Sequence, residues 1–290
     1  MSRILAVGGA TLDLIFTLVH YPLEDTEQRA LSHRTTRGGN ASNILSVLAQ
    51  CGHVCEFAGV LAMDEEGLLV QQDFEMHRIG TQWCQRSQDG STPVSSITLS
   101  RAAGSRTIVH YRSLPEYDFQ AFTKIPLSDF DWLHFEGRNV RETSRMLRYA
   151  RTCLTDQTIS LEIEKLREGI EDLFDDADVL MFSKQYTLST GEDSPTAFLT
   201  RLSKRLSGKM VVLSWGHEGA WTMDGAGAIA QCAAQIQNEA IDTLGAGDVF
   251  NAGLIDALAS GRTLEEAAEC ACRLAERKVG QNGFTDLFTP

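Results

Sequence analysis

Residues 241–253 read IDTLGAGDVFNAG, a loop that turns into a helix. Gly245 and Gly247 lack a Cβ atom, so a bulky group can approach the backbone N–H groups closely. Apolar residues then recur at helical spacing as far as Gly261, at Phe250, Leu254, Ile255 and Leu258. The first N–H groups of this helix, up to Asp248, have no intrahelical partners. They predict a site for phosphoryl oxygens or for the charge that develops during phosphoryl transfer.

Asp248 is the residue of this stretch that could carry chemistry. A carboxylate beside an anion site is repelled by the anion unless it has a task of its own. In the first turn of a helix it is expected to stay ionised, and it could accept the proton of a hydroxyl that attacks phosphorus. Such a base is typically worth about 10²–10⁴-fold in rate. The alternative is that Asp248 simply caps the helix.

Composition bounds the class of protein. The chain has 290 residues, a formal net charge of −13 and 43% hydrophobic residues, which favours one large α/β domain with an appendage, or two domains. The acidic balance argues against nucleic-acid binding, because that requires clustered Lys and Arg. Seven cysteines without paired spacing predict free thiols in a reducing cytosol. The apolar run at residues 3–9 is too short for a signal peptide or membrane span and predicts a buried first strand.

Strand-like and helix-like segments alternate along most of the chain, which predicts a mostly parallel sheet with helices on both faces. Further strands are expected at 54–60, 132–135, 159–163, 179–182 and 210–215. One helix should follow residue 40, and another should begin with a capping box at Thr263. Ligands bind beyond the carboxyl ends of parallel strands. The loops expected there are 8–13, 38–43, 136–139, 214–219 and 242–248.

Two segments depart from this alternation. Residues 12–36 and 93–112 each contain two short extended pieces around a turn, so each resembles a hairpin. Together they predict a small antiparallel β-sheet that stands apart from the main body, and a lid is one use for such a sheet. Residues 1–11, 37–92 and 113–290 would then form the α/β core.

Polar residues near two of the expected loops could bind a sugar. Gly39 and its neighbour allow close backbone approach, and Asn40 and Asn43 lie on one face of the helix that follows. Two carboxamides there could grip neighbouring hydroxyls, or Asn40 could be an ordinary helix N-cap. Asp13, just past the first strand, could accept two hydrogen bonds from a diol.

The segment around Asp248 resembles the second signature of the ribokinase-like, or PfkB, family of sugar and nucleoside kinases. In that family the Asp is the base and the preceding glycine-rich N–H groups form the anion hole. Further motifs follow in the family's order and approximate spacing, and they are most similar to its ketohexokinase branch. These are GGNASN at 38–43, HFEGRN at 134–139, EIEK at 162–165, SWGHEGA at 214–220 and DTLGAGDVFN at 242–251. The resemblance covers essentially the whole chain and implies a ribokinase-like fold whose β-sheet lid also forms the contact of a homodimer.

The resemblance also implies roles for individual residues. The sugar would be bound by Asp13, Gly39, Asn40 and Asn43, joined by Asp25 of the partner subunit. Arg106, on the second hairpin, would pair with nucleotide phosphate or the transferring group, although a solvated arginine is the simpler interpretation of the sequence alone. The nucleotide would lie along Gly216 and Gly219. The γ-phosphate would be held by Gly245, Ala246 and Gly247.

Charged residues at two other strand ends remain open in role. Glu136 and Arg138 could contact the sugar or support the residues that do, because two charges at the end of a short buried strand are unusual. Ribokinases carry Asn-x-x-Glu to organise magnesium through water, whereas residues 183–186 here read SKQY. Glu162 and Glu164 share one face of a strand and could take that part. ATP and Mg²⁺ are therefore the expected cofactors, with no metal ligands assigned and a requirement for K⁺ left open.

The leading hypothesis is an ATP-dependent kinase that phosphorylates the C1 hydroxyl of a ketohexose, converting fructose to fructose 1-phosphate with Asp248 as general base. A second hypothesis is another carbohydrate kinase of this family, acting on ribose, tagatose or a deoxygluconate-type sugar. A third is a sugar-binding protein on the same fold without catalysis. A dinucleotide-binding enzyme or P-loop kinase is disfavoured, because neither glycine motif is present. The expected protein is a cytoplasmic homodimer that binds neither nucleic acid nor membrane.

Overall fold

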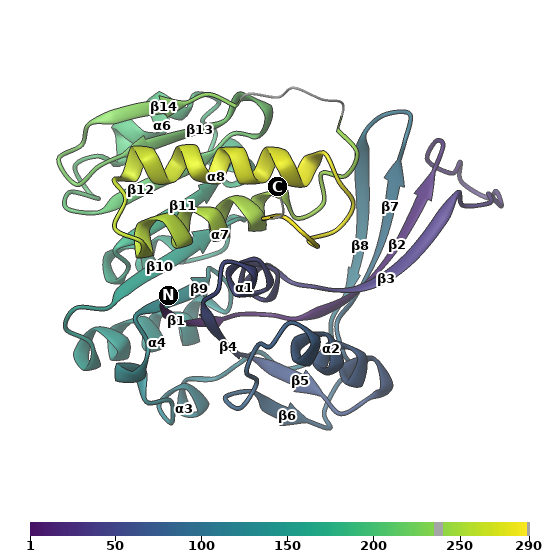
Figure 1. Ribbon diagram of the computed structural model, residues 1–290, viewed down its shortest axis with the longest axis horizontal. Coiled ribbons are helices and arrows are strands. Elements are labelled where there is room, and N and C mark those ends of the chain that lie inside the picture. The colour runs from purple at the N-terminus through teal and green to yellow at the C-terminus, as the bar shows by residue number, and fades with distance from the viewer. Residues whose placement is uncertain (235–239, 289–290) are drawn as a thin grey trace.

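The computed structural model describes residues 1–234 and 240–288 and contains a large mixed sheet, a small four-stranded sheet and a two-stranded sheet (Figure 1). The large sheet has the strand order β14-β13-β12-β11-β10-β9-β1-β4. Its strands are β1 (Arg3–Val7), β4 (Val54–Ala58), β9 (Trp132–Glu136), β10 (Thr158–Ile163), β11 (Val179–Ser183), β12 (Met210–Ser214), β13 (Ala220–Met223) and β14 (Ile229–Cys232). All pairings from β4 to β12 are parallel, and β13 and β14 add an antiparallel edge. The predicted mostly parallel sheet and its strands are confirmed.

Helices cover both faces of this sheet, as the alternation predicted. They are α1 (Asn40–Gln50), α2 (Glu65–Met76), α3 (Phe119–Phe122), α4 (Val140–Cys153), α5 (Lys184–Ser189), α6 (Pro195–Leu202), α7 (Ala246–Ala259) and α8 (Leu264–Val279). The predicted capping box is present at the start of α8, where Thr263 and Glu266 exchange hydrogen bonds. The two-stranded sheet, β5 (Val60–Ala62) and β6 (Gln85–Ser87), flanks α2 in sequence.

Two apolar clusters pack against the two faces, because successive side chains of a strand point to opposite sides. In β1, Ile4 and Ala6 join the cluster under α1, α7 and α8. Leu5 and Val7 join the cluster that includes side chains of α4 and α6. Because the strands are buried on both faces, their sequences are short and continuously apolar. Packing on both faces also holds the carboxyl ends of the strands in place.

The small sheet has the order β3-β2-β7-β8 and is built from β2 (Thr11–Leu18), β3 (Ser32–Gly38), β7 (Val94–Ser100) and β8 (Ser105–Tyr111). Each predicted hairpin is antiparallel, and β2 and β7 join the two hairpins through a parallel pairing. Figure 1 shows these four strands projecting from one side of the body. All seven residues of the edge strand β8 are exposed.

Two features are absent from the part of the chain that the structure describes, namely a membrane-spanning helix and a disulfide bond. No helix there is long and apolar enough to cross a membrane. All seven cysteines are free thiols.

Candidate active site

A cavity of about 1000 Å³ lies between the small sheet and the carboxyl ends of the large sheet. Alternate residues of the small sheet line one wall, namely Asp13, Ile15, Ser95, Ile97, Arg106, Ile108 and His110. The opposite wall comes from strand ends and from the start of α7, and includes Glu136, Glu162, Ser183, Ser214, Gly247 and Asp248. The cavity lies where the parallel topology predicts a ligand site, and it is large enough for a sugar together with nucleotide phosphates.

The glycine loop leads directly into α7. Gly245 is the residue before the helix, with φ of 76°, and a Cβ atom there would overlap the Phe284 ring. The Ala246 N–H donates to the Thr243 carbonyl oxygen at 3.3 Å. Within the described residues the N–H groups of Gly247 and Asp248 have no such partner, and both residues line the cavity. These two N–H groups are the donors from which the sequence predicted an anion site.

Asp248 is buried in the first turn of α7 and accepts a 2.7 Å hydrogen bond from Asn43 Nδ2. Among the described residues its carboxylate accepts no hydrogen bond from a backbone N–H of α7, although it lies in the first turn, where an acid interacts favourably with the helix dipole. Burial raises the pKa of Asp248; the Asn43 hydrogen bond opposes this, and nearby carboxylates including Glu164 add to it. The first-turn position was expected to keep this group ionised, but desolvation has the larger effect. A carboxylate with a raised pKa is better suited to accept a proton near neutral pH.

The start of α1 brings two carboxamides into the cavity. Gly39 precedes the helix with φ of 103°, and a Cβ atom there would overlap the Gly9 carbonyl oxygen. Asn40 is the first helical residue rather than the N-cap, and its Nδ2 donates to Glu162 Oε2 at 3.0 Å and Glu164 Oε2 at 3.3 Å. The N-cap alternative for Asn40 is therefore wrong. Close backbone packing at Gly39 aims the first turn of α1 at the acidic side of the cavity.

Arg37 is a residue of the site that the sequence did not reveal. Its buried guanidinium donates to Asp73 Oδ1 at 2.6 Å and to Asn43 Oδ1 at 3.4 Å. With Asn43 Oδ1 facing a cation, the amide nitrogen of Asn43 faces Asp248. Arg37 thus fixes the orientation of the group that holds the candidate base. The sequence feature that could have identified Arg37 is its position directly before the glycines of the 38–43 motif.

Asp13 lies on β2 and faces the cavity from the small sheet. Thr11 Oγ1 donates to Asp13 Oδ1 at 2.8 Å, and a Cβ atom on Gly38 would overlap this carboxylate. Burial raises the pKa of Asp13, while hydrogen bonds from Thr11 and Ser95 oppose the rise. The carboxylate keeps acceptor capacity for hydroxyl donors within the cavity.

Glu162, Glu164 and Asp248 form an acidic cluster in the cavity wall. Glu162 is buried and accepts hydrogen bonds from Asn40 and, at 2.9 Å, from Asn251 Nδ2. Burial raises the pKa of Glu162 well above its ordinary value, and repulsion from Asp248 and Glu164 adds to this. Asn251 was missed, although it follows Asp248 by one helical turn and therefore shares its face.

A hard divalent cation prefers oxygen ligands in a site with an excess of negative charge. Within the described residues, however, no group of three or more His, Cys, Asp or Glu side chains has the arrangement of a metal-binding cluster. Glu162 and Glu164 could therefore supply one or two ligands, directly or through water. The remaining ligands would have to come from water and phosphate oxygens, as is usual for Mg²⁺.

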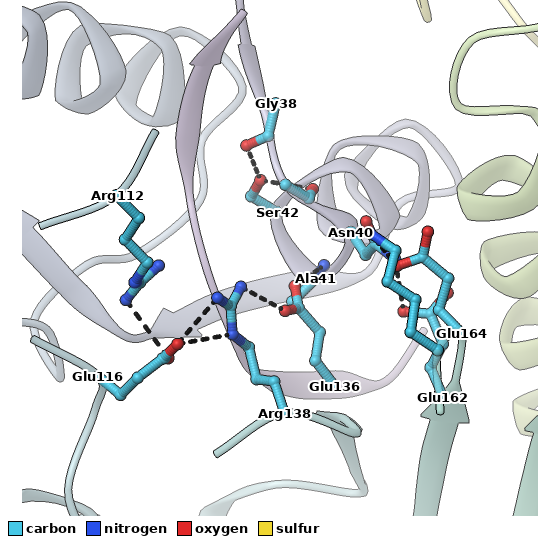
Figure 2. A network of polar contacts seen from close by, with 12 residues as sticks. Gly38, Asn40, Ala41, Ser42, Arg112, Glu116, Glu136, Arg138, Glu162 and Glu164 are labelled. Atoms are coloured by element: carbon cyan, nitrogen blue, oxygen red, sulfur yellow. Dashed lines mark hydrogen bonds and ion pairs between the residues drawn. The ribbon is translucent and has the colours of Figure 1, made fainter. Parts of the chain in front are cut away.

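Glu136 and Arg138 form a charged network beside the start of α1 (Figure 2). Glu136 Oε1 accepts the Ala41 N–H at 2.7 Å, and Glu136 Oε2 pairs with Arg138 at 3.2 Å. Arg138 also pairs with Glu116 at 2.9 Å, which pairs in turn with Arg112 at 3.3 Å. The network links the segment after β8 to the first turn of α1. These contacts favour support of the neighbouring sugar-site residues over a role as the principal sugar ligands.

The remaining predicted residues differ in placement. Arg106 lines the cavity and donates to Thr243 Oγ1 at 3.3 Å, which places it beside the glycine loop, and Gly216 also lines the cavity. Gly219 does not line it, because the backbone at 232–234 packs where its Cβ atom would be. Asp25 is exposed, has φ of 57° and lies outside the cavity wall. Within one chain, the structure does not bring it to the other sugar-site candidates.

Basic side chains at the cavity wall were also missed. Besides Arg106 and Arg138, the wall includes Arg34, Lys165, Arg167 and Lys184. They are scattered in sequence, so no local run of charge marks them. Cations around the cavity offset the charge of a bound polyphosphate.

The raised pKa of Asp248 predicts how activity changes with pH. A general base works only when deprotonated, so kcat/KM should fall as pH decreases through the raised pKa rather than near 4, the usual range for Asp. Initial rates from pH 5 to 9 at saturating nucleotide would measure this. Because Glu162 lies nearby and is also shifted, the apparent pKa belongs to the pair. A profile that stays flat down to pH 5 would contradict the expectation.

Comparison with known proteins agrees with this site. A family model described as the pfkB family carbohydrate kinase matches residues 1–289. A ketohexokinase of Mus musculus is 36% identical over 294 residues, covering 99% of this chain and 99% of the mouse protein. Ribokinase from Arabidopsis thaliana, complexed with ribose and ATP, has a TM-score of 0.78 at 18% identity, covering 97% of this chain and 94% of that chain. Ribokinase from Cryptococcus neoformans var. grubii serotype A, in complex with ADP, has a TM-score of 0.76 at 20% identity, covering 98% and 95%. The two ribokinases show that the fold is shared.

Proposed function

Because the chain belongs to the pfkB family of carbohydrate kinases, and is therefore an ATP-dependent sugar kinase, we propose that it phosphorylates the C1 hydroxyl of a ketohexose, with Asp248 as general base. The observation that carries the proposal is the buried Asp248 carboxylate, held by Asn43 at the start of α7 beside backbone N–H groups that have no partner among the described residues. The identity with a ketohexokinase across both whole chains supports the choice of a ketohexose.

The proposed reaction follows from the positions of these groups. In this proposal the sugar would lie between Asp13 and Asn43, which both line the cavity, with its C1 hydroxyl facing Asp248. Asp248 accepts the hydroxyl proton as the oxygen attacks the γ-phosphorus, and ADP leaves. The N–H groups of Gly247 and Asp248 stabilise charge on the transferring group, which is the main contribution that a protein makes to phosphoryl transfer. Arg106 approaches the same group from the small sheet.

We propose that ATP is used with Mg²⁺. Oxygen ligands from Glu162 and Glu164, directly or through water, would complement phosphate oxygens around the ion. The metal would neutralise phosphate charge near a cluster that is otherwise strongly acidic.

A coupled assay of ADP release tests the sugar. Fructose, tagatose, ribose, a deoxygluconate and a nucleoside should be compared at matched concentrations, with position of phosphorylation read by ³¹P–¹H correlation. We expect fructose to be converted to the 1-phosphate, with a kcat/KM at least about tenfold above that for ribose. One mispaired hydroxyl in the bound ribose would account for this difference. No turnover with any ketohexose would reject the proposal. Sugar binding by calorimetry without ADP release would favour the non-catalytic alternative.

We propose that residues 12–36 and 93–112 act as a lid over the core formed by residues 1–11, 37–92 and 113–290. The small sheet supplies one cavity wall and shares no strand pairing with the large sheet, so sugar bound against Asp13 should hold it in place. Amide hydrogen exchange of β2 and β7 should slow when sugar is added. The central strand β10, whose sheet neighbours do not depend on the lid, is the internal control. Equal exchange with and without sugar would argue against closure.

We propose a cytoplasmic homodimer through the small sheet. Its edge strand β8 is exposed along its whole length and carries Val109 and Tyr111 on the face turned away from the cavity, which a second copy could cover. Free thiols suit a reducing compartment. Asp25 would then reach the sugar of the partner subunit. Asp25→Asn should raise the KM for sugar about tenfold and leave the KM for ATP unchanged, as one lost charged hydrogen bond predicts. A monomer by sedimentation with wild-type sugar affinity in this variant would reject the idea.

A further inference from the structure

Lys278, near the end of α8, is a lysine whose side chain is completely buried. Its Nζ donates to the Asp242 carbonyl oxygen at 2.9 Å and lies 3.2 Å from Asp242 Oδ2. Burying an ammonium and a carboxylate costs several kcal/mol for each ion, and the attraction between them often fails to offset it. If this position served only to pack the core, an apolar side chain would be sufficient and no buried ion pair would be needed.

The carboxylate of this pair begins the glycine loop. Asp242 Oδ1 accepts the Leu244 N–H at 3.0 Å, and the N–H groups of Ile241 and Asp242 both donate to the Val279 carbonyl oxygen. Although burial alone would raise it, the pKa of Asp242 is lowered by Lys278 and by the hydrogen bonds from Leu244 and Arg34. Burial lowers the pKa of Lys278, and Asp242 opposes that change, so each charge of the pair favours the other. The loop that carries the N–H groups of Gly247 and Asp248 is therefore fastened to the end of α8 through one residue.

A third charge connects the same carboxylate to the small sheet. Arg34, on β3, pairs with Asp242 Oδ2 at 2.7 Å and donates to Asn282 Oδ1 at 3.2 Å. Arg34 and Asp242 both line the cavity. Taken by themselves, these two cations and one carboxylate carry one net positive charge beside the glycine loop. That sign favours an anion in front of it.

We propose that Lys278, Asp242 and Arg34 form a positioning triad that holds the glycine loop in its phosphate-binding conformation and couples it to the small sheet. Lys278 touches neither sugar nor nucleotide in this scheme. It acts by fixing the backbone N–H groups that stabilise the transferring phosphoryl group. Movement of the small sheet acts on the same loop through Arg34. The proposal rests on the phosphoryl-transfer site described above and is independent of which sugar is used.

The test compares Lys278→Met with Lys278→Arg in steady-state kinetics, using the sugar that the wild-type enzyme phosphorylates fastest. Misplacing catalytic donors by about 1 Å can cost on the order of 10²-fold, so Lys278→Met should lose about that factor in kcat. Sugar affinity, measured by calorimetry without nucleotide, should stay within about threefold. Lys278→Arg should recover at least about tenfold of the lost kcat, because it keeps the charge.

A matched control is Lys209→Met. Lys209 also donates to two backbone carbonyl oxygens, those of Asp175 and Ala177 at 2.7 Å, but neither of these partners lines the cavity, whereas Asp242 does. Its kcat should stay within about threefold of wild type. A folded Lys278→Met enzyme with kcat within threefold of wild type would overturn the triad, and so would equal losses in Lys278→Met and Lys209→Met.

If Lys278→Met fails to fold, Arg34→Gln tests the triad instead. Arg34 is partly exposed, so its replacement leaves no cavity in the core. The expected result is a kcat about tenfold lower, with faster amide exchange at residues 242–247 in the intact protein. Unchanged kcat and exchange would overturn the coupling. Failure of all ketohexoses as substrates would reject the proposed function and leave these ratios measurable with another sugar.

Discussion

Replacing Asp248 by Asn is expected to lower kcat by on the order of 10² or more, up to about 10⁴-fold, while the fold and most of the sugar affinity remain. The amide keeps the shape of the side chain and can still accept the hydrogen bond from Asn43, but it cannot take a proton from the attacking hydroxyl. The measurement is steady-state turnover together with calorimetric sugar binding.

Asp256→Asn provides the matched control, because Asp256 belongs to the same helix and pairs with His53 at 2.9 Å outside the cavity wall. Its kcat should remain within about twofold of wild type. Near-normal turnover in Asp248→Asn would remove this residue as the base. A ternary crystal complex in which Asp248 points away from the sugar would do so as well.

Asp13→Asn should have the second-largest effect, raising the KM for sugar by about 10²-fold. A carboxylate can accept two hydroxyl donors, and hydrogen bonds to a charged group contribute about 1.5–3 kcal/mol each. The substitution keeps the volume beside Gly38, where no additional atom fits, so the cavity should keep its shape. Initial rates at varied sugar and saturating ATP give the value.

The KM for ATP serves as the internal control for Asp13→Asn, because Asp13 faces the cavity from the small sheet and Arg106, rather than Asp13, approaches the glycine loop. It should stay within about twofold. A sugar KM within threefold of wild type would show that Asp13 is not a principal sugar ligand. Its contact with Thr11 would then be structural.

Much of the fold was predictable because local rules and the overall architecture agree. Apolar spacing located α7, the capping box located the start of α8, and strand-like runs between helices gave the parallel sheet. Since parallel strands end at one edge, the loops that follow them were expected together, and most of them meet at the cavity.

The details that failed depend on contacts between distant segments. Desolvation of Asp248 arises from packing of α1 against α7, so residue spacing did not predict its raised pKa. Gly219 lies outside the cavity wall, and the neighbouring backbone leaves no room for a Cβ atom there, which the sequence pattern did not show. Lys278 has the sequence context of an ordinary basic residue at a helix C-terminus, which is a common preference. Only the folded structure shows that Lys278 is buried and that Asp242 lies beside it.

The order of strands in the small sheet also bears on how the protein is made. β2 pairs with β7, which begins only at Val94, so the first hairpin leaves the ribosome well before its parallel neighbour exists. At a synthesis rate of about 5–20 residues per second, the nascent hairpin waits for several seconds, and an isolated two-stranded hairpin is marginal in water. The N-terminal hairpin is therefore expected to gain stable pairing only after residues 94–100 have been synthesised.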